Sequence, residues 1–264
     1  MRLRSLAWLL VGLMLSLSAH AVEDAGTLMR IPSARADAKI PVFVHATEGA
    51  KATVVLLSGG GGGIGKVSDG GWPDSSNFLV RTAPLFANSG FNVAIMARAS
   101  DLSDLDYGVR VGNEHMDDIR KVLQKMKEKF PGPVWLVGTS RGTVSAAAAG
   151  IALRDEKLID GIALTSSVTD YKKTGAVPSQ DLDRLTVPVL VMHHEQDGCK
   201  VCRPHEVSGI LRGLKNAPVK KQIMVNGGSN PQGDPCEGQH YHGFIGMEKE
   251  AVGIISDWIK KPIS

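Results

Sequence analysis

Five short apolar runs, separated by longer connecting segments, set the strongest limit on what this chain can fold into. The runs are rich in valine, isoleucine and leucine and cover residues 53–57, 92–96, 134–137, 161–164 and 187–192. Runs that are apolar on both faces are typical of strands buried on both sides, and helix-length connections between them favour a parallel sheet. The sequence therefore predicts an α/β fold with a mostly parallel central sheet and helices on both faces.

Two of the connecting segments and one segment near the C-terminus have a helical pattern. Apolar residues recur at three- and four-residue steps between Gly112 and Phe130, and the prolines that follow end the pattern. An alanine-rich segment from Thr143 to about Leu153 and a final segment from about Met247 to Lys260 predict two more helices. No repeat, linker or composition shift divides residues 22–264, so we expect them to form a single domain.

The first 21 residues have the pattern of a signal peptide. Arg2 and Arg4 precede an apolar run of about 12 residues, and small residues lead to Ala21. A membrane-spanning helix needs ~20 apolar residues, so an uncleaved anchor is the weaker alternative. We expect residues 1–21 to be removed on export, which makes the mature chain periplasmic or secreted.

The charge of the chain argues against large polyanionic partners. The formal net charge is +3 and falls to +1 without Arg2 and Arg4, since the leader contains no acidic residue. With no basic run and few aromatic residues, the chain lacks the usual features of a surface that binds nucleic acid or an anionic membrane. We expect a small-molecule substrate, no nucleic-acid partner and no membrane association after signal cleavage.

The segment from Gly138 to Gly142, with the sequence Gly-Thr-Ser-Arg-Gly, places Ser140 between a predicted strand and a predicted helix. A nucleophilic serine needs this strand-turn-helix setting, because the sharp turn projects its hydroxyl group above the strand ends. The alternative is a loop serine that only caps the helix N-terminus. The context favours Ser140 as a nucleophile.

An activated serine needs a base, and the base needs an acid that orients it. The acid comes before the histidine in serine hydrolases with this strand-turn-helix nucleophile. Asp197 follows the apolar strand that ends near Met192. Glu195, in the same loop, and Asp170, after the preceding strand, are the rival acids.

Two histidines near the C-terminus, His240 and His242, are candidate bases. In an extended segment their rings point the same way, so periodicity does not choose between them. We expect the earlier pair, His193 and His194, to end a strand with one ring packed and the other exposed to water.

Glycines 59–63 and Gly65 follow the strand at 53–57. Glycine allows a backbone amide to turn inward, so Gly60 is a candidate oxyanion donor together with the amide of Arg141. The run also matches glycine-rich nucleotide-binding patterns, but Val67 stands where a P-loop needs serine or threonine. Nucleotide binding is therefore the weaker interpretation, and we expect no cofactor.

The chain has three cysteines, Cys199, Cys202 and Cys236. In an exported protein this number indicates one disulfide and one free thiol. Because Cys199 and Cys202 are close in sequence, we expect Cys236 to pair with one of them. The alternative is a zinc site formed by the three cysteines with His205 and His240, although we expect no metal.

These motifs together resemble the α/β-hydrolase superfamily, in particular small exported bacterial proteins that are dienelactone-hydrolase-like or esterase-like. The resemblance covers nearly the whole mature chain. It implies that Asp197 rather than Asp170 is the acid, and that His242, followed by Gly243 and Phe244, is the base. More weakly, it implies a Cys199–Cys236 disulfide. One departure is Ser58-Gly59, where the superfamily commonly has His-Gly before the oxyanion loop.

The resemblance implies a serine hydrolase that cleaves a small ester through an acyl-enzyme, with the triad Ser140, Asp197 and His242. Only about 20 residues, 166–185, separate two core strands where many relatives insert a lid. We therefore expect an open site with a minimal lid or none. A peptidase or amidase with the same fold, or a binding protein that has lost activity, are the alternatives.

Overall fold

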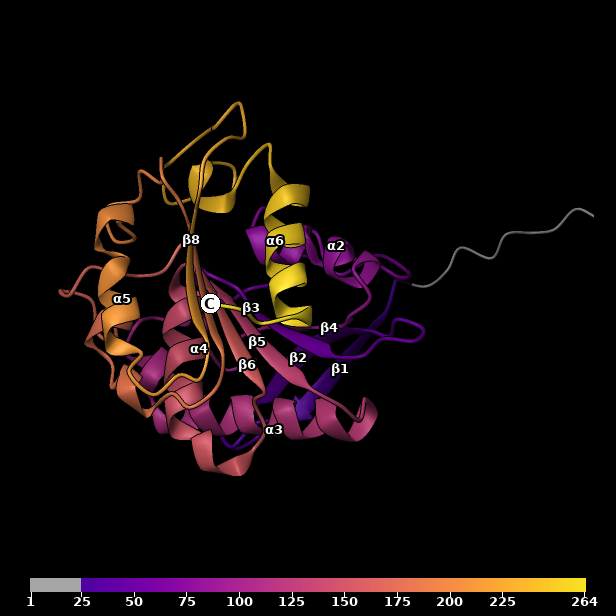
Figure 1. Ribbon diagram of the computed structural model, residues 1–264. Helices are drawn as coiled ribbons and strands as arrows, with labels where there is room; N and C mark the ends of the chain where they lie inside the picture. Colours follow the sequence, from indigo (N-terminus) through magenta and orange to yellow (C-terminus); the bar gives the residue numbers. More distant parts are fainter. Residues whose placement is uncertain (1–24) are drawn as a thin grey trace, which may run out of the picture.

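The computed structural model describes residues 25–264, and the predicted signal peptide lies outside them (Figure 1). Eight strands form one sheet in the order β1-β2-β4-β3-β5-β6-β7-β8. β1 and β4 pair antiparallel with β2, and every other neighbouring pair is parallel. The bounds are β1 Thr27–Pro32, β2 Lys39–His45, β3 Thr53–Leu57, β4 Asn92–Met96, β5 Val134–Thr139, β6 Gly161–Thr165, β7 Val189–His194 and β8 Lys220–Val225.

The mostly parallel sheet agrees with the prediction, and the five apolar runs are β3 to β7. β7 begins after Pro188 rather than at Val187, and it extends two residues further than predicted, to His194. Strands β1, β2 and β8 were not predicted. β1 and β8 are the edge strands, and exposed or half-buried side chains interrupt their apolar pattern.

The helices form a layer on each face of the sheet. Alternate residues of β3 face opposite layers, so Val54 and Leu56 belong to one core cluster while Val55 and Leu57 belong to the other. The first cluster includes residues of α1 (Phe78–Arg81), α2 (Ala83–Asn88) and α6 (Glu248–Lys260). The second includes residues of α3 (Asn113–Lys129), α4 (Arg141–Ala152) and α5 (Ser208–Gly213). In Figure 1, α2 and α6 lie side by side.

Short 3-10 turns complete the described secondary structure. They cover Val109–Val111, Arg154–Glu156, Val177–Ser179, Leu182–Arg184, Pro204–Glu206 and Tyr241–Gly243. None of the helices in residues 25–264 has the length and apolar character needed to cross a bilayer.

The carboxyl ends of the parallel strands meet at one edge of the sheet. Ser58 follows β3, Ser140 follows β5, and Asp197 lies in the loop after β7. Chain segments that are far apart in sequence are therefore brought together here, as is usual for binding sites in α/β sheets.

Candidate active site

Ser140 occupies a strained turn between β5 and α4. Its φ is 53° and its ψ is −129°, a conformation that non-glycine residues rarely adopt. The glycines on either side of it are needed for close packing. A Cβ on Gly142 would lie 2.0 Å from the carbonyl oxygen of Leu57, and one on Gly138 would lie 2.6 Å from the carbonyl oxygen of Gly142. This is the local geometry that exposes a serine hydroxyl at the top of a sheet.

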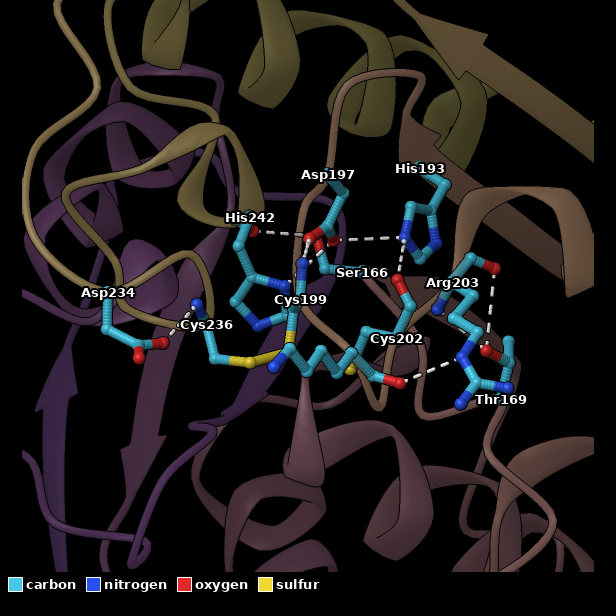
Figure 2. Close-up of a disulfide and its surroundings, with 11 residues drawn as sticks. Ser166, Thr169, His193, Asp197, Cys199, Cys202, Arg203, Asp234, Cys236 and His242 are labelled. Carbon is cyan, nitrogen blue, oxygen red and sulfur yellow. Dashed lines mark hydrogen bonds and ion pairs between the residues drawn. A yellow bond between two sulfur atoms is a disulfide. The ribbon is translucent and has the colours of Figure 1, made fainter.

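Asp197 lies between two histidines (Figure 2). Its Oδ2 is 2.8 Å from Nδ1 of His242 and 3.0 Å from Nε2 of His193. Its Oδ1 accepts a hydrogen bond of 2.9 Å from the backbone N–H of Cys199. The carboxylate is buried and fixed by donors on both oxygens.

Opposing effects set the pKa of Asp197. Burial raises it, but the hydrogen bonds from His193 and His242, together with the interactions between their charges and the carboxylate, lower it to about 2. Asp197 is therefore ionised at neutral pH. An ionised carboxylate at Nδ1 of His242 keeps the proton on that nitrogen and leaves Nε2 free to act as a base.

The rival acids have other partners. Glu195 is exposed and accepts a hydrogen bond from the side chain of Asn226, while Asp170 accepts one from the backbone of Lys172. The structure thus brings Asp197, rather than either rival, to His242.

The two candidate bases also differ in their surroundings. His242 is buried in the 3-10 turn Tyr241–Gly243, and Ser166 Oγ donates a hydrogen bond of 2.7 Å to its carbonyl oxygen. His240 packs its ring edge-on against Tyr241 instead. The ring of His242 is the one directed to Asp197.

No hydrogen bond joins the Ser140 hydroxyl to Nε2 of His242. Nε2 is buried and has no hydrogen-bond partner within residues 25–264. Burial raises the pKa of the buried Cys202 thiol, and the Ser140 side chain acts in the opposite direction. Ser140 and His242 nevertheless line the same cleft. Hydrogen bonds between a nucleophile and its base often tighten only when substrate is bound.

The cleft beside Ser140 has a volume of about 210 Å³. It is small and its lining is mostly polar or glycine. The lining residues are Gly59, Gly60, Gly61, Gly63, Ser75, Ser76, Asn77, Phe78, Thr139, Ser140, Cys236, Glu237, Gly238, His242 and Gly243. A cleft of this size and polarity suits a small hydrophilic group rather than a long acyl chain.

The glycine loop after β3 forms one wall of the cleft. A Cβ on Gly59 would lie 2.8 Å from Cβ of Ser140, so the loop backbone passes directly beside the candidate nucleophile. Gly60 has a φ of 53°, in the left-handed region that favours glycine. Gly60 and the first residue of α4, Arg141, are therefore positioned near Ser140, where backbone donors for an oxyanion are needed.

A buried arginine that sequence reasoning missed holds this loop. Arg110 is only 1% exposed, and its Nη2 donates hydrogen bonds to the carbonyl oxygens of Ser58, at 3.1 Å, and Gly60, at 3.0 Å. Nε donates to Leu105 and Nη1 to the Ser145 hydroxyl. In a trans peptide the C=O and the following N–H point in opposite directions. By binding the carbonyl oxygens of Ser58 and Gly60, Arg110 turns the N–H groups of Gly59 and Gly61 away from itself and fixes the peptides on either side of the Gly60 amide.

Arg110 remains a cation despite its burial. Burial, and then the positive charge of Arg141, lower its pKa to about 9, still above neutral pH. Its four hydrogen-bond acceptors are all neutral.

The expectation for His193 and His194 was wrong in one respect. Neither ring is exposed to water, since both residues are fully buried at the end of β7. His193 contacts Asp197, and His194 stacks on Tyr241. A four-residue spacing brings side chains together on a helix, but His193 lies in β7 and Asp197 in the loop after it, so the sequence carries no signal for this contact.

The nucleotide-binding alternative finds no support in the loop geometry. After the glycine run the chain forms a bridge between Lys66 and Asp74 rather than a helix. A dinucleotide or P-loop site needs a helix N-terminus immediately after the glycines.

The zinc alternative is not assembled either. Cys199 and Cys236 form the disulfide that the family resemblance implied, and Cys202 is a buried free thiol. The side chain of His205 is 76% exposed, so it does not join them.

Several solved structures that resemble this chain are described as α/β hydrolases, esterases or a dienelactone hydrolase. The dienelactone hydrolase of Anabaena variabilis matches with a TM-score of 0.64 at 12% identity, over 92% of this chain and 100% of that one. An esterase of Pyrococcus furiosus matches with a TM-score of 0.63 at 14% identity, over 91% and 93%. A serine hydrolase without a lid from Xanthomonas campestris matches with a TM-score of 0.59 at 15% identity, over 90% and 96%.

No protein-family model and no curated protein sequence matches the chain. The similarity in structure and the strand order together identify its fold as that of the α/β hydrolases. The expected fold is thus confirmed.

Proposed function

We propose that this protein is a serine hydrolase that cleaves small, polar carboxylic esters through an acyl-enzyme on Ser140. The observation that carries the proposal is the contact of 2.8 Å between Asp197 and His242 beside the strained serine turn. In the proposed mechanism His242 Nε2 takes the Ser140 proton and later returns it to the leaving alcohol. Asp197 orients the imidazole and stabilises its charged form.

The backbone amides of Gly60 and Arg141 are the proposed oxyanion donors. Gly60 lies on the glycine loop that lines the cleft together with Ser140, and Arg141 follows Ser140 as the first residue of α4. Preorganised backbone donors stabilise the negative charge that develops on the carbonyl oxygen as the serine attacks. The mechanism needs no metal or cofactor.

The cleft supports the choice of a small, polar ester. Serine, asparagine and glycine make up most of its lining, and Phe78 is its one large apolar side chain. A long acyl chain would find little apolar surface here, and its hydrophobic transfer energy of ~0.8 kcal/mol per methylene would not be gained.

A fluorophosphonate probe tests the proposal directly. We expect the probe to label Ser140 in the folded protein, and Ser140→Ala to remove labelling and to lower kcat by at least ~10³-fold. A panel of p-nitrophenyl esters compared with aminoacyl amides would separate an esterase from a peptidase. Folded protein that is neither labelled nor active on either panel would favour a binding function.

We further infer that the mature chain is exported. The pattern of residues 1–21 and the Cys199–Cys236 disulfide both support this, since disulfides persist in oxidising compartments. N-terminal sequencing of the protein recovered from the periplasm or medium tests the inference, with the first residue expected at Val22.

A further inference from the structure

Three sulfur atoms and one ring nitrogen gather beside the cleft. The ligand atoms of Cys199, Cys202 and His242 all lie within 4.8 Å of one another, and all three residues are buried. The sulfur of Cys236 is not one of these ligand atoms, but it is bonded to the sulfur of Cys199 and so lies next to the group (Figure 2). This set differs from the zinc ligands considered from the sequence, because it contains His242 and neither His205 nor His240.

The ring of His242 is prepared to bind a metal. Its Nδ1 is engaged by the ionised carboxylate of Asp197, while its buried Nε2 has no partner among the described residues. Metal-binding histidines almost always have a carboxylate or carbonyl oxygen at the nitrogen that does not bind the metal. This partner fixes both the tautomer and the direction of the lone pair.

We propose that reduction of the Cys199–Cys236 disulfide creates a site for a soft divalent metal such as Zn²⁺. Its ligands are the thiolates of Cys199, Cys202 and Cys236 and Nε2 of His242. Three sulfurs and one imidazole nitrogen form a common tetrahedral zinc set, in which ligand sulfurs lie about 3.8 Å apart. The ligand atoms of Cys199, Cys202 and His242, at most 4.8 Å apart, require only small shifts. The sulfur of Cys236 must separate from that of Cys199 and move into the fourth position.

The proposed site forms in two steps, reduction of the disulfide and then binding of the metal. A dithiol reductant supplies two electrons and two protons to the disulfide and is itself oxidised to a disulfide. The Cys199–Cys236 bond breaks and two thiols form. Each of the three thiols then releases its proton to solvent as the metal binds, because the thiolate is the ligand.

The consequence for catalysis rests on the proposed function. Cys236 and His242 both line the cleft, so a metal ion can reach the site from solvent. A metal bound to Nε2 occupies the lone pair that the proposed mechanism uses to take the Ser140 proton. Zinc should therefore inhibit the reduced enzyme and leave the disulfide-bonded enzyme active.

Cobalt binding tests the site without any measurement of activity. The full mature chain is titrated with Co²⁺, with and without a phosphine reductant, and the absorption spectrum is recorded; Zn²⁺ is then added to displace the cobalt. We expect one Co²⁺ per reduced chain, with intense tetrahedral bands and thiolate-to-cobalt charge transfer, and neither in the oxidised chain. Equal binding in both states, or no binding after reduction, would overturn the proposal.

Variants locate the site. Cys202→Ser should bind Co²⁺ at least ~10-fold more weakly and with less charge transfer, because one thiolate is lost. His205→Ala is the matched control and should bind like the parent. Cys202→Ala provides a second test if the serine is poorly tolerated at this buried position, and circular dichroism checks the fold of each variant. Unchanged binding in folded Cys202 variants would refute the assignment.

The two proposals can fail separately. Cobalt binding by a reduced protein that hydrolyses no ester leaves the metal site in place and contradicts only the proposed function. Ester hydrolysis by a protein that binds no cobalt supports the proposed function and contradicts only the metal site.

Discussion

Nε2 of His193 lies 3.0 Å from Oδ2 of Asp197, the same carboxylate oxygen that faces His242. Nε2 also lies 3.0 Å from the carbonyl oxygen of Cys202, so the single N–H is directed between two acceptors. His193 is completely buried at the end of β7. It therefore acts on His242 through Asp197, as a positioning residue that limits the rotation of the carboxylate.

We predict that His193→Ala lowers kcat by ~10- to 100-fold with little change in KM. The substitution leaves Asp197 with one anchor fewer, so His242 is oriented less well, while the cleft that binds substrate is untouched. Steady-state kinetics on the best ester measure both constants. His193→Gln keeps a side-chain N–H and should recover part of the loss, and the exposed His205→Ala should behave like the parent. A change confined to KM would contradict this role.

Arg110 offers a second test of positioning. Arg110→Met removes the donors to the carbonyl oxygens of Ser58 and Gly60, which belong to the peptides on either side of the one that carries the Gly60 amide. The loop around that amide is then free to rotate it away from the oxyanion. Losing one oxyanion donor typically costs ~10²- to 10³-fold in kcat, and we expect a loss of ~10- to 100-fold for a loosened loop. Kinetics at saturating ester and thermal unfolding would be measured together.

Arg110→Lys is the matched variant for this experiment. Lysine keeps the positive charge but not the planar fork that reaches several acceptors at once, so it should restore little of the activity. Full recovery with lysine would show that charge, rather than the geometry of the loop, explains the effect.

The predictable part of the fold is the part buried on both faces. β3 to β6 begin at the predicted residues because their apolar runs have no exposed face to interrupt them, and the serine turn is a local pattern. β8 is different. Its first five residues, Lys220 to Met224, are only half-buried, so its sequence Lys-Lys-Gln-Ile-Met-Val carries no clear strand signal.

The candidate site also has a part that could be predicted from the sequence and a part that could not. The serine turn can be found from its motif, but the choice of Asp197 and His242 over Asp170 and His240 depends on the resemblance to α/β hydrolases. The structure brings Asp197 and His242 together. Arg110 could not be found, because its role depends on hydrogen bonds to residues about 50 positions away along the chain. Buried polar residues of this kind have no periodic signal, and only the tertiary contacts show their partners.

Because His115 is buried, we predict that the protein loses stability in mild acid. Burial, followed by the charges of Arg110 and Arg35, lowers its pKa from 6.5 to about 3. Between about pH 6.5 and pH 3, His115 is protonated in the unfolded chain but stays neutral in the folded chain. Stability present above pH 6.5 is therefore lost as the pH falls, by up to ~1.4 kcal/mol per pH unit from this one group.

Replacing His115 by glutamine should reduce this pH dependence. Ser145 Oγ lies 3.0 Å from Nε2 of His115 and accepts a hydrogen bond from Arg110, so its own proton is available for a hydrogen bond to the ring. The glutamine oxygen can accept in its place but does not titrate. Urea unfolding at several pH values between 7 and 4 gives the slopes. His205→Ala, an exposed histidine, should keep the parental slope, and equal slopes for parent and His115→Gln would contradict the prediction.

The same substitution at two glycines should have opposite effects. Gly253 lies within helix α6, and a Cβ there would meet no atom within 4 Å, so Gly253→Ala should stabilise the protein by ~0.5–1 kcal/mol. At Gly142 the Cβ would lie 2.0 Å from the carbonyl oxygen of Leu57, which the rigid β3 backbone cannot avoid. Gly142→Ala should destabilise by more than ~3 kcal/mol and move Ser140 out of its turn. Urea unfolding measures the stability of both variants, and probe labelling reports on Ser140. A stable, fully labelled Gly142→Ala protein would contradict the prediction and show that the serine turn packs less tightly against β3 than these distances require.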